Sequence, residues 1–194
     1  MGAAMCGHLI GKGYRVAVST RTKAKADALV ARGATWADSP RGVGEQSDVV
    51  FTIVGFPADV REVYFGPQGL LSTARSGQVF VDMTTTEPTL AKEIHEAARA
   101  KGVATVDAPV SGGDVGARNA TLSIMIGGGQ TVGQGLLPLF GAAGQRGMHP
   151  GGAGAGQHPQ MSTPIGVAGT VGGHWESLVY APQGGFDPAS PNST

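Results

Sequence analysis

Two spacings of apolar residues alternate along this chain of 194 residues, one typical of helices and one typical of buried strands. Over residues 1–12 small and apolar residues recur at helical spacing, and Gly13 stands where a left-handed cap is expected. Short, continuously apolar runs follow, as expected of parallel strands that are buried on both faces. The predicted strands lie at residues 14–18, 48–54, 79–82, 103–106 and 122–126.

Helices are predicted between these runs. Pro57 favours the start of one of them, because proline suits the first helical position, and Gly33 and Gly102 are expected as caps of two others. The predicted helices lie at 23–31, at 57–65, in a segment that ends at 100, and more weakly at 133–140. Because parallel neighbours need helical crossovers, this alternation predicts an α/β fold with a Rossmann-like, doubly wound parallel sheet. Its ligand is expected beyond the carboxyl ends of the strands.

The last third of the chain is rich in glycine, and residues 151–156 have the sequence GGAGAG. The segment 157–180 keeps an apolar spacing but contains Pro159 and Pro164. Since an interior proline costs about 3 kcal/mol, we expect a helix that is kinked or broken near Pro164. Residues 182–194 are polar, with proline and glycine, and are expected to be disordered.

Composition and charge narrow the class of function. The 14 basic and 14 acidic side chains balance, which argues against nucleic acid or an anionic membrane as a partner and favours a small molecule. The single cysteine, Cys6, allows no intramolecular disulfide and is expected in the core. No apolar run approaches the ~20 residues of a membrane span, and the start lacks signal-peptide features. We therefore expect a cytoplasmic protein, and we predict no metal site.

One loop has the most specific sequence in the chain, DAPVSGG over residues 107–113. It resembles the substrate loop of the β-hydroxyacid dehydrogenases, the family of 3-hydroxyisobutyrate dehydrogenase and tartronate semialdehyde reductase. A hydroxyl beside two glycines offers one donor and accessible backbone N–H groups, which suits a carboxylate. The resemblance implies that Ser111, Gly112 and Gly113 bind the acid group of the substrate. Without the surrounding match to the family, the tripeptide Ser-Gly-Gly is typical of a turn.

The start of the chain, Met1 and Gly2, resembles the end of the family's Gly-x-Gly-x-x-Gly turn, which binds the cofactor pyrophosphate. Taken alone, these two residues are an ordinary start. The resemblance implies that both contact the cofactor, and that the first strand and the first two glycines are absent. That strand would lie between the strands at 14–18 and 48–54, so its loss is expected to leave unpaired backbone groups that another chain can fill.

Three further loops resemble cofactor contacts of the family. Arginine after the second strand of a dinucleotide fold accommodates a 2′-phosphate, so Arg21 and Thr22 favour NADP over NAD, although Arg21 alone is typical of a surface charge. Phe56 and Pro57 match the loop that lies against the nicotinamide ribose. In the segment DMTTTEP, Thr85 matches a hydroxyl that approaches the cofactor, whereas the plain alternative there is a helix N-cap formed by Thr86.

The family's catalytic segment has the pattern Gly-x-x-Gly-x-Gly-x-x-x-Lys-x-x-Asn. The glycines of this pattern are kept, but Gln160 stands at the lysine position and Thr163 at the asparagine position. An amide cannot exchange a proton near neutral pH, and a positioned acid or base contributes roughly 10²–10⁴-fold to a rate. His158 is two residues away and is expected to face elsewhere on a helix. We therefore expect impaired catalysis.

Together these matches imply an NAD(P)-dependent oxidoreductase that transfers hydride between NADP(H) and a small 3-hydroxyacid or its semialdehyde. The alternative is a non-catalytic NADP-binding or interaction protein. We expect an NAD(P)-binding domain at 1–150, and a remnant of the interdomain helix with the catalytic segment at 151–181. The family's helical C-terminal domain, which usually forms the dimer, is expected to be missing, so a homodimer stays an open possibility.

Overall fold

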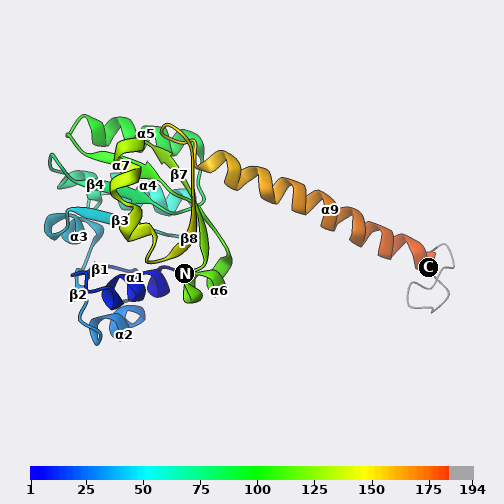
Figure 1. The fold of residues 1–194 in the computed structure, drawn as a ribbon, viewed down its shortest axis with the longest axis horizontal. Helices are drawn as coiled ribbons and strands as arrows, with labels where there is room; N and C mark the ends of the chain where they lie inside the picture. The colour runs from blue at the N-terminus through cyan, green and yellow to red at the C-terminus, as the bar shows by residue number, and fades with distance from the viewer. Residues whose placement is uncertain (184–194) are drawn as a thin grey trace. The chain divides into compact units, whose positions relative to one another are not determined.

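A computed structural model describes residues 1–183, except for the side chains at 145, 146, 150 and 181–183. It has two compact units, Met1–Gln160 and Met161–Thr194. All strands found within residues 1–183 belong to the first unit (Figure 1). None of the helices within residues 1–183 is both long enough and apolar enough to pass through a membrane.

The larger sheet contains six strands, in the order β3-β4-β5-β7-β6, with β8 paired to β7. Its strands are β3 (Val49–Thr52), β4 (Val79–Asp82), β5 (Ala104–Asp107), β6 (Val110–Ser111), β7 (Leu122–Gly128) and β8 (Gly144–Gly151). β3, β4 and β5 are parallel, as predicted, but β7 runs antiparallel to β5 and β6. The sheet is therefore mixed. The connection from β6 to β7 is shorter than the dozen or more residues that a parallel crossover needs.

A separate two-stranded parallel sheet pairs β1 (Ala17–Val18) with β2 (Thr35–Trp36). The doubly wound order 3-2-1-4-5-6 requires a strand between β1 and β3, and within the described residues no strand lies there. The strands of the described residues therefore form two separate sheets. Val18 and Phe51 on the two unjoined strands are half-buried, whereas a central parallel strand is normally covered on both faces.

Helices connect the strands, and four of them begin or end where proline and glycine predicted. Gly13, Gly33 and Gly102 have φ values of +86°, +100° and +70°, which confirms the left-handed caps. Pro57 opens its helix, as predicted. The helices are α1 (Gly2–Gly11), η1 (Lys23–Ala26), α2 (Asp27–Val30), α3 (Pro40–Gln46), α4 (Pro57–Phe65), η2 (Leu70–Ser72), α5 (Pro88–Arg99), α6 (Gly113–Asn119), α7 (Gln130–Gly135), α8 (Leu137–Phe140) and α9 (Gln157–Gln183).

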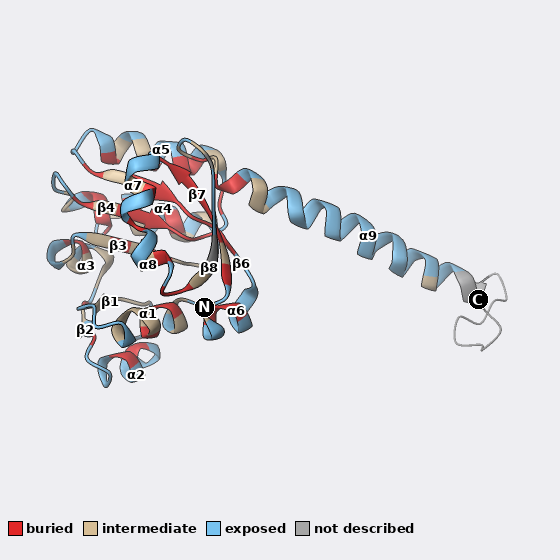
Figure 2. Cartoon of the chain, viewed as in Figure 1, coloured by how far each residue is buried: buried red, intermediate tan, exposed pale blue. Residues whose placement is uncertain are grey.

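The core has two parts, one on each face of the larger sheet. Successive side chains of a strand point to opposite faces of the sheet, so consecutive residues of β4 belong to different clusters. Phe80 belongs to one cluster and Val81 to the other. Leu90 and Ile94 of α5 cover the Phe80 face, and Phe140 of α8 packs in the Val81 cluster. Figure 2 shows the buried strands of this sheet between more exposed helices. Because packed side chains cover both faces of the sheet, we expect a ligand at the carboxyl ends of the strands.

The long helix α9 corrects one prediction. It continues through Pro164 without a break, although a kink or break was expected there. Proline removes one backbone hydrogen bond, to the carbonyl of Gln160, and the helical bonds on either side of it continue the helix. Pro159 lies in the first turn, where the missing N–H costs little. Of the tail that was expected to be disordered, residues 184–194 lie outside the described part of the chain.

Candidate functional site

β4 and β5 both end on a buried aspartate, and the two residues, Asp82 and Asp107, are register partners. Oδ1 of Asp82 accepts hydrogen bonds from Oγ1 of Thr52 at 2.9 Å and from the backbone N of Thr84 at 3.1 Å. Its Oδ2 has no partner among the described residues. Burial raises the pKa of Asp82 to about 6, while the bonds from Thr84 and Thr52 lower it and the nearby Asp107 raises it further.

Asp107 anchors the glycine-rich segment that precedes α9. Its Oδ1 accepts a hydrogen bond from the backbone N of Gly154 at 2.7 Å. Burial raises the pKa of Asp107, and the backbone N–H groups of Gly154, Gly156 and Gln157 act in the opposite direction. A Cβ at Gly156 would collide with the carbonyl oxygens of Met125 and Asp107, and Gly154 has φ +81°. Close packing around a buried carboxylate therefore explains why glycine stands at these two positions.

Gln157, the first residue of α9, is fully buried and joins this segment to the loop after β4. Its Oε1 accepts from the backbone N of Thr86 at 3.0 Å, and its Nε2 donates to the carbonyl of Thr84 at 3.0 Å. Thr84 and Thr86 are buried, whereas Thr85 between them is exposed. The loop therefore presents Thr85, one of the predicted cofactor residues, at the carboxyl edge of the sheet.

The alternative function of Thr86 as a helix N-cap is wrong. The N-cap of α5 is Glu87, without a side-chain cap bond, and Pro88 is the first helical residue. Oγ1 of Thr86 is buried without a partner among the described residues. Proline at the first position has no N–H to satisfy, which reduces what a capping side chain would stabilise.

The loop after β1 meets the start of α4 through an ion pair. Nη1 of Arg21 lies 3.0 Å from Oδ1 of Asp59, and Oδ2 of Asp59 accepts from the backbone N of Phe56 at 3.1 Å. The side chain of Arg21 is 82% exposed, so this pair contributes little to stability and leaves the guanidinium accessible. Phe56 is also exposed, and Pro57 follows it as the first residue of α4. The structure thus brings Arg21 and the loop at 56–57 together.

The start of α1 lies against the same loop. A Cβ at Gly2 would approach Cγ2 of Ile53 to 2.8 Å, so glycine permits this close contact. Met1 is the N-cap of α1, and its carbonyl accepts from the backbone N of Ala4 at 3.0 Å. Thr22 is the N-cap of the short helix η1 and is exposed. Five of the predicted cofactor residues therefore lie at the N-terminal ends of helices or directly before them.

The predicted substrate residues lie where β6 ends and α6 begins, with Gly112 as the N-cap of α6 and Gly113 as its first residue. Ser111 is exposed and pairs with Ser123 of β7. Gly112 has φ +127° and Gly113 has φ +61°, conformations that favour glycine. The tripeptide is therefore a junction between a strand and a helix, and the Ser111 hydroxyl is accessible. Its use by a substrate stays a prediction.

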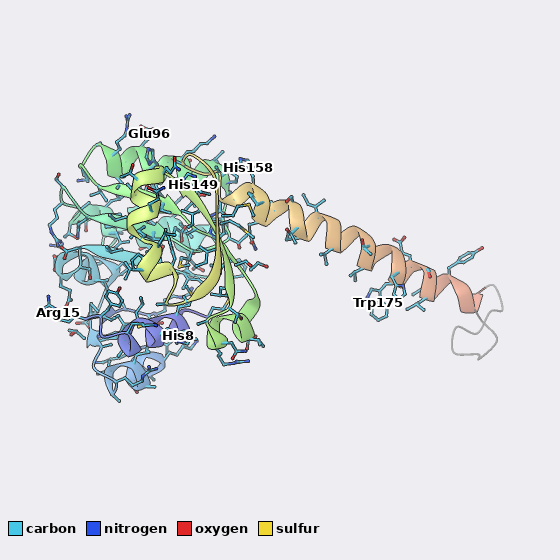
Figure 3. The ribbon with its side chains drawn as sticks, viewed as in Figure 1. His8, Arg15, Glu96, His149, His158 and Trp175 are labelled. Atoms are coloured by element: carbon cyan, nitrogen blue, oxygen red, sulfur yellow. The ribbon has the colours of Figure 1, made fainter. Side chains whose placement is uncertain are left out.

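Gln160 lies one turn along α9 from Gln157, on the same helix face. Its Oε1 is buried without a hydrogen-bond partner among the described residues. His158 between them is exposed, and Figure 3 shows it at the start of α9, with His149 on β8. His149 is bonded to the carbonyl of Gly128 through its Nε2, at 3.1 Å. Thr163 is exposed and belongs to the second unit.

The sequence as a whole was compared with known proteins. Residues 1–152 match the family described as the NAD binding domain of 6-phosphogluconate dehydrogenase. The chain belongs to this family. Membership accounts for the sheet order and for the convergence of loops at the carboxyl ends of β3, β4 and β5, and it confirms the resemblance drawn from the loop motifs.

Similar proteins include dehydrogenases and reductases. The chain is 52% identical over 188 residues to the probable 3-hydroxyisobutyrate dehydrogenase-like 1, mitochondrial, of Arabidopsis thaliana, covering 96% of this chain and 56% of that protein. It is 36% identical over 188 residues to 2-hydroxy-3-oxopropionate reductase of Escherichia coli, covering 97% and 64%. The structure of Mycobacterium tuberculosis 3-hydroxyisobutyrate dehydrogenase with L-serine superposes with a TM-score of 0.87 at 31% identity, covering 97% and 64%. The chain thus spans about three-fifths of these relatives.

Sequence reasoning missed the residues that hold the site together. Asp59 stands three residues after Phe56, the position from which an acidic side chain reaches back to the N-cap N–H, and that signal was available. The buried aspartates and Gln157 gave no comparable signal, because a polar residue at a strand end or helix start is usually solvated. Their bonds connect segments far apart in the chain, such as 84–86 with 157.

Proposed function

We propose that this chain forms the NADP-binding part of an oxidoreductase that transfers hydride between NADP(H) and a small 3-hydroxyacid or its semialdehyde, weakened by Gln160. The observation that supports it best is the meeting of the loop after β1 with the start of α4, in which Arg21 bonds Asp59 and Asp59 bonds the backbone of Phe56. The NAD(P)-binding domain would span 1–150, and the catalytic segment with the interdomain helix 151–181. Family membership and the named relatives support the same reaction class.

The residues at this edge fit a dinucleotide. Gly2 keeps the start of α1 free of a Cβ beside Ile53, and Arg21 is an exposed cation suited to a 2′-phosphate. NADP, when bound, supplies or accepts the hydride. Phe56, Pro57 and Thr85 would line its nicotinamide half. Because Arg21 already neutralises Asp59, the preference for NADP over NAD depends on how readily the guanidinium leaves that carboxylate.

The substrate acid group would bind at the end of β6. Ser111 offers its hydroxyl, and the backbone N–H groups of Gly112 and Gly113 are accessible because neither residue has a side chain. Such a cradle selects a carboxylate and leaves the rest of a small hydroxyacid to the neighbouring loops. Together with the relatives named above, this cradle supports a small 3-hydroxyacid as the substrate.

The proton step is where this chain departs from its family pattern. When a hydroxyl is oxidised to a carbonyl, its proton must pass to a base, and the reverse reaction must return it. The amide of Gln160 can orient a hydroxyl by a hydrogen bond, but it cannot exchange that proton near neutral pH. A loss of roughly 10²–10⁴-fold in rate follows. This same residue favours the second candidate function, a protein that binds NADP without turnover.

A lysine restored at position 160 tests the proposal. Purified wild-type chain and Gln160→Lys would be assayed by NADPH formation with 3-hydroxyisobutyrate, glycerate and 4-hydroxybutyrate. We expect NADPH to bind to both, with turnover at least about 100-fold higher in Gln160→Lys. His158→Lys is the matched control, because it adds the same charge two residues away on an exposed position. Equal rates for the two variants, or efficient turnover by the wild type, would overturn the assignment of position 160.

A further inference from the structure

We propose that Gln157 is a positioning residue that holds Thr85 in place for the cofactor. The inference rests on the proposed function, in which Thr85 contacts the nicotinamide half. Gln157 itself is 0% exposed, so it acts through the loop that it bonds and not by touching a ligand.

The bonds of Gln157 have the pattern of one residue of a β-strand. Its side-chain amide donates to the carbonyl of Thr84 and accepts from the N–H of Thr86, both at 3.0 Å, as a backbone amide would in a sheet. The two bonded residues turn inward and are buried, so the residue between them must face outward. The exposure of Thr85 is a direct consequence.

Other side chains cannot replace this arrangement. An ionised glutamate has the same length but only acceptors, so it would place an oxygen against the carbonyl of Thr84. Leucine fills the same space and leaves both backbone groups of the loop without a partner. Asparagine is one methylene shorter and cannot span both bonds from the same backbone position.

The position of Gln157 is itself fixed by β5. Asp107 accepts from the N–H of Gly154, and Gly156 packs against the carbonyl of Asp107 with no room for a side chain. The start of α9 is therefore held on one strand by Asp107 and on the neighbouring loop by Gln157. Through this connection, the segment that leads to Gln160 and the loop that presents Thr85 move as one body.

Binding of two ligands distinguishes a positioning effect of Gln157 from a general loss of stability. NADPH reaches both halves of the site, whereas adenosine 2′,5′-bisphosphate reaches only the end at Arg21. In Gln157→Leu we expect NADPH affinity to fall about tenfold, the value of one lost hydrogen bond, with the affinity for the bisphosphate unchanged. The amide hydrogen of Thr86 should also exchange faster in this variant, without any ligand present.

A second buried glutamine provides the matched control. Gln78 is 2% exposed, and its amide bridges the backbone carbonyls of Gly44 and Ser47 at the amino end of β4. Gln78→Leu should lower the free energy of unfolding by about as much as Gln157→Leu does. It should leave the affinities for NADPH and for the bisphosphate unchanged. If Gln157→Leu does not fold, Gln157→Asn keeps a neutral amide that is too short to span both bonds.

A double variant completes the test. If Gln157 acts through Thr85, the effects of Gln157→Leu and Thr85→Val on NADPH affinity are less than additive. Full additivity, or an equal loss of both ligands in Gln157→Leu, would overturn the inference while leaving the proposed function intact. Failure of the wild type to bind either ligand would overturn the proposed function and this inference with it.

Discussion

Replacing Asp82 by asparagine should change how the stability of the protein depends on pH. Burial raises the pKa of Asp82 from 3.8 to about 6, and its Oδ2 has no partner among the described residues. Between these two pH values the folded chain keeps the proton and the unfolded chain releases it. The free energy of unfolding therefore falls as the pH rises from 3.8 towards 6. Above pH 6 this loss of stability stays constant.

The size of the effect follows from the shift. A pKa raised from 3.8 to about 6 corresponds to about 3 kcal/mol, at roughly 1.4 kcal/mol for each pH unit. About 2 kcal/mol of it should develop between about pH 4 and pH 7. The asparagine side chain in Asp82→Asn would keep the acceptor for Thr52 and Thr84 but cannot ionise. Its own unpartnered Nδ2 adds a constant cost, which cancels when the two pH values are compared.

Urea unfolding at the two pH values measures this directly. The stability of Asp82→Asn minus that of the wild type should rise by about 2 kcal/mol from about pH 4 to pH 7. Asp114→Asn is the control, because its carboxylate is 66% exposed in a surface pair with Arg118 and contributes little. A difference for Asp82→Asn that does not change with pH would refute the argument that this carboxyl group is protonated in the folded chain near pH 5.

Two other predictions concern the cofactor edge and the glycine segment. Asp59→Asn should tighten NADPH binding about threefold to fivefold, because it frees Arg21 and keeps an acceptor for the N–H of Phe56. Fluorescence titration checks this prediction, and an equal gain in NADH affinity would contradict it. Gly156→Ala should lower the free energy of unfolding by about 1–3 kcal/mol, because its Cβ meets backbone oxygens, while Gly152→Ala, with open space around it, should be nearly neutral in the same denaturation experiment.

The sequence predicted the sheet of this domain because its signals are local. The apolar runs at β3 and β4 are long enough to indicate buried strands, and Gly13 and Pro57 mark helix ends through their own backbone restrictions. β2 and α3 were missed, since a two-residue strand and a helix with two glycines carry almost no periodic signal. The direction of β7 depends on a short connection, which strand composition does not indicate.

The site was predictable only in part. Loop motifs indicated Arg21, Thr85 and Ser111 one by one, and the structure shows which loops meet. Asp59 joins one pair of segments, and its partner Arg21 lies 38 residues away in the chain. Gln157 joins another pair, and its partners lie more than 70 residues away. Such long-range polar pairs depend on the completed fold, so no local pattern specifies them.

Titration of the purified chain with NADPH and NADH, followed by nicotinamide fluorescence, tests the central claim most directly. We predict saturable binding of both, tighter for NADPH, with the difference lost in Arg21→Ala. Tighter binding of NADH, or no saturable binding of either nucleotide, would contradict the account.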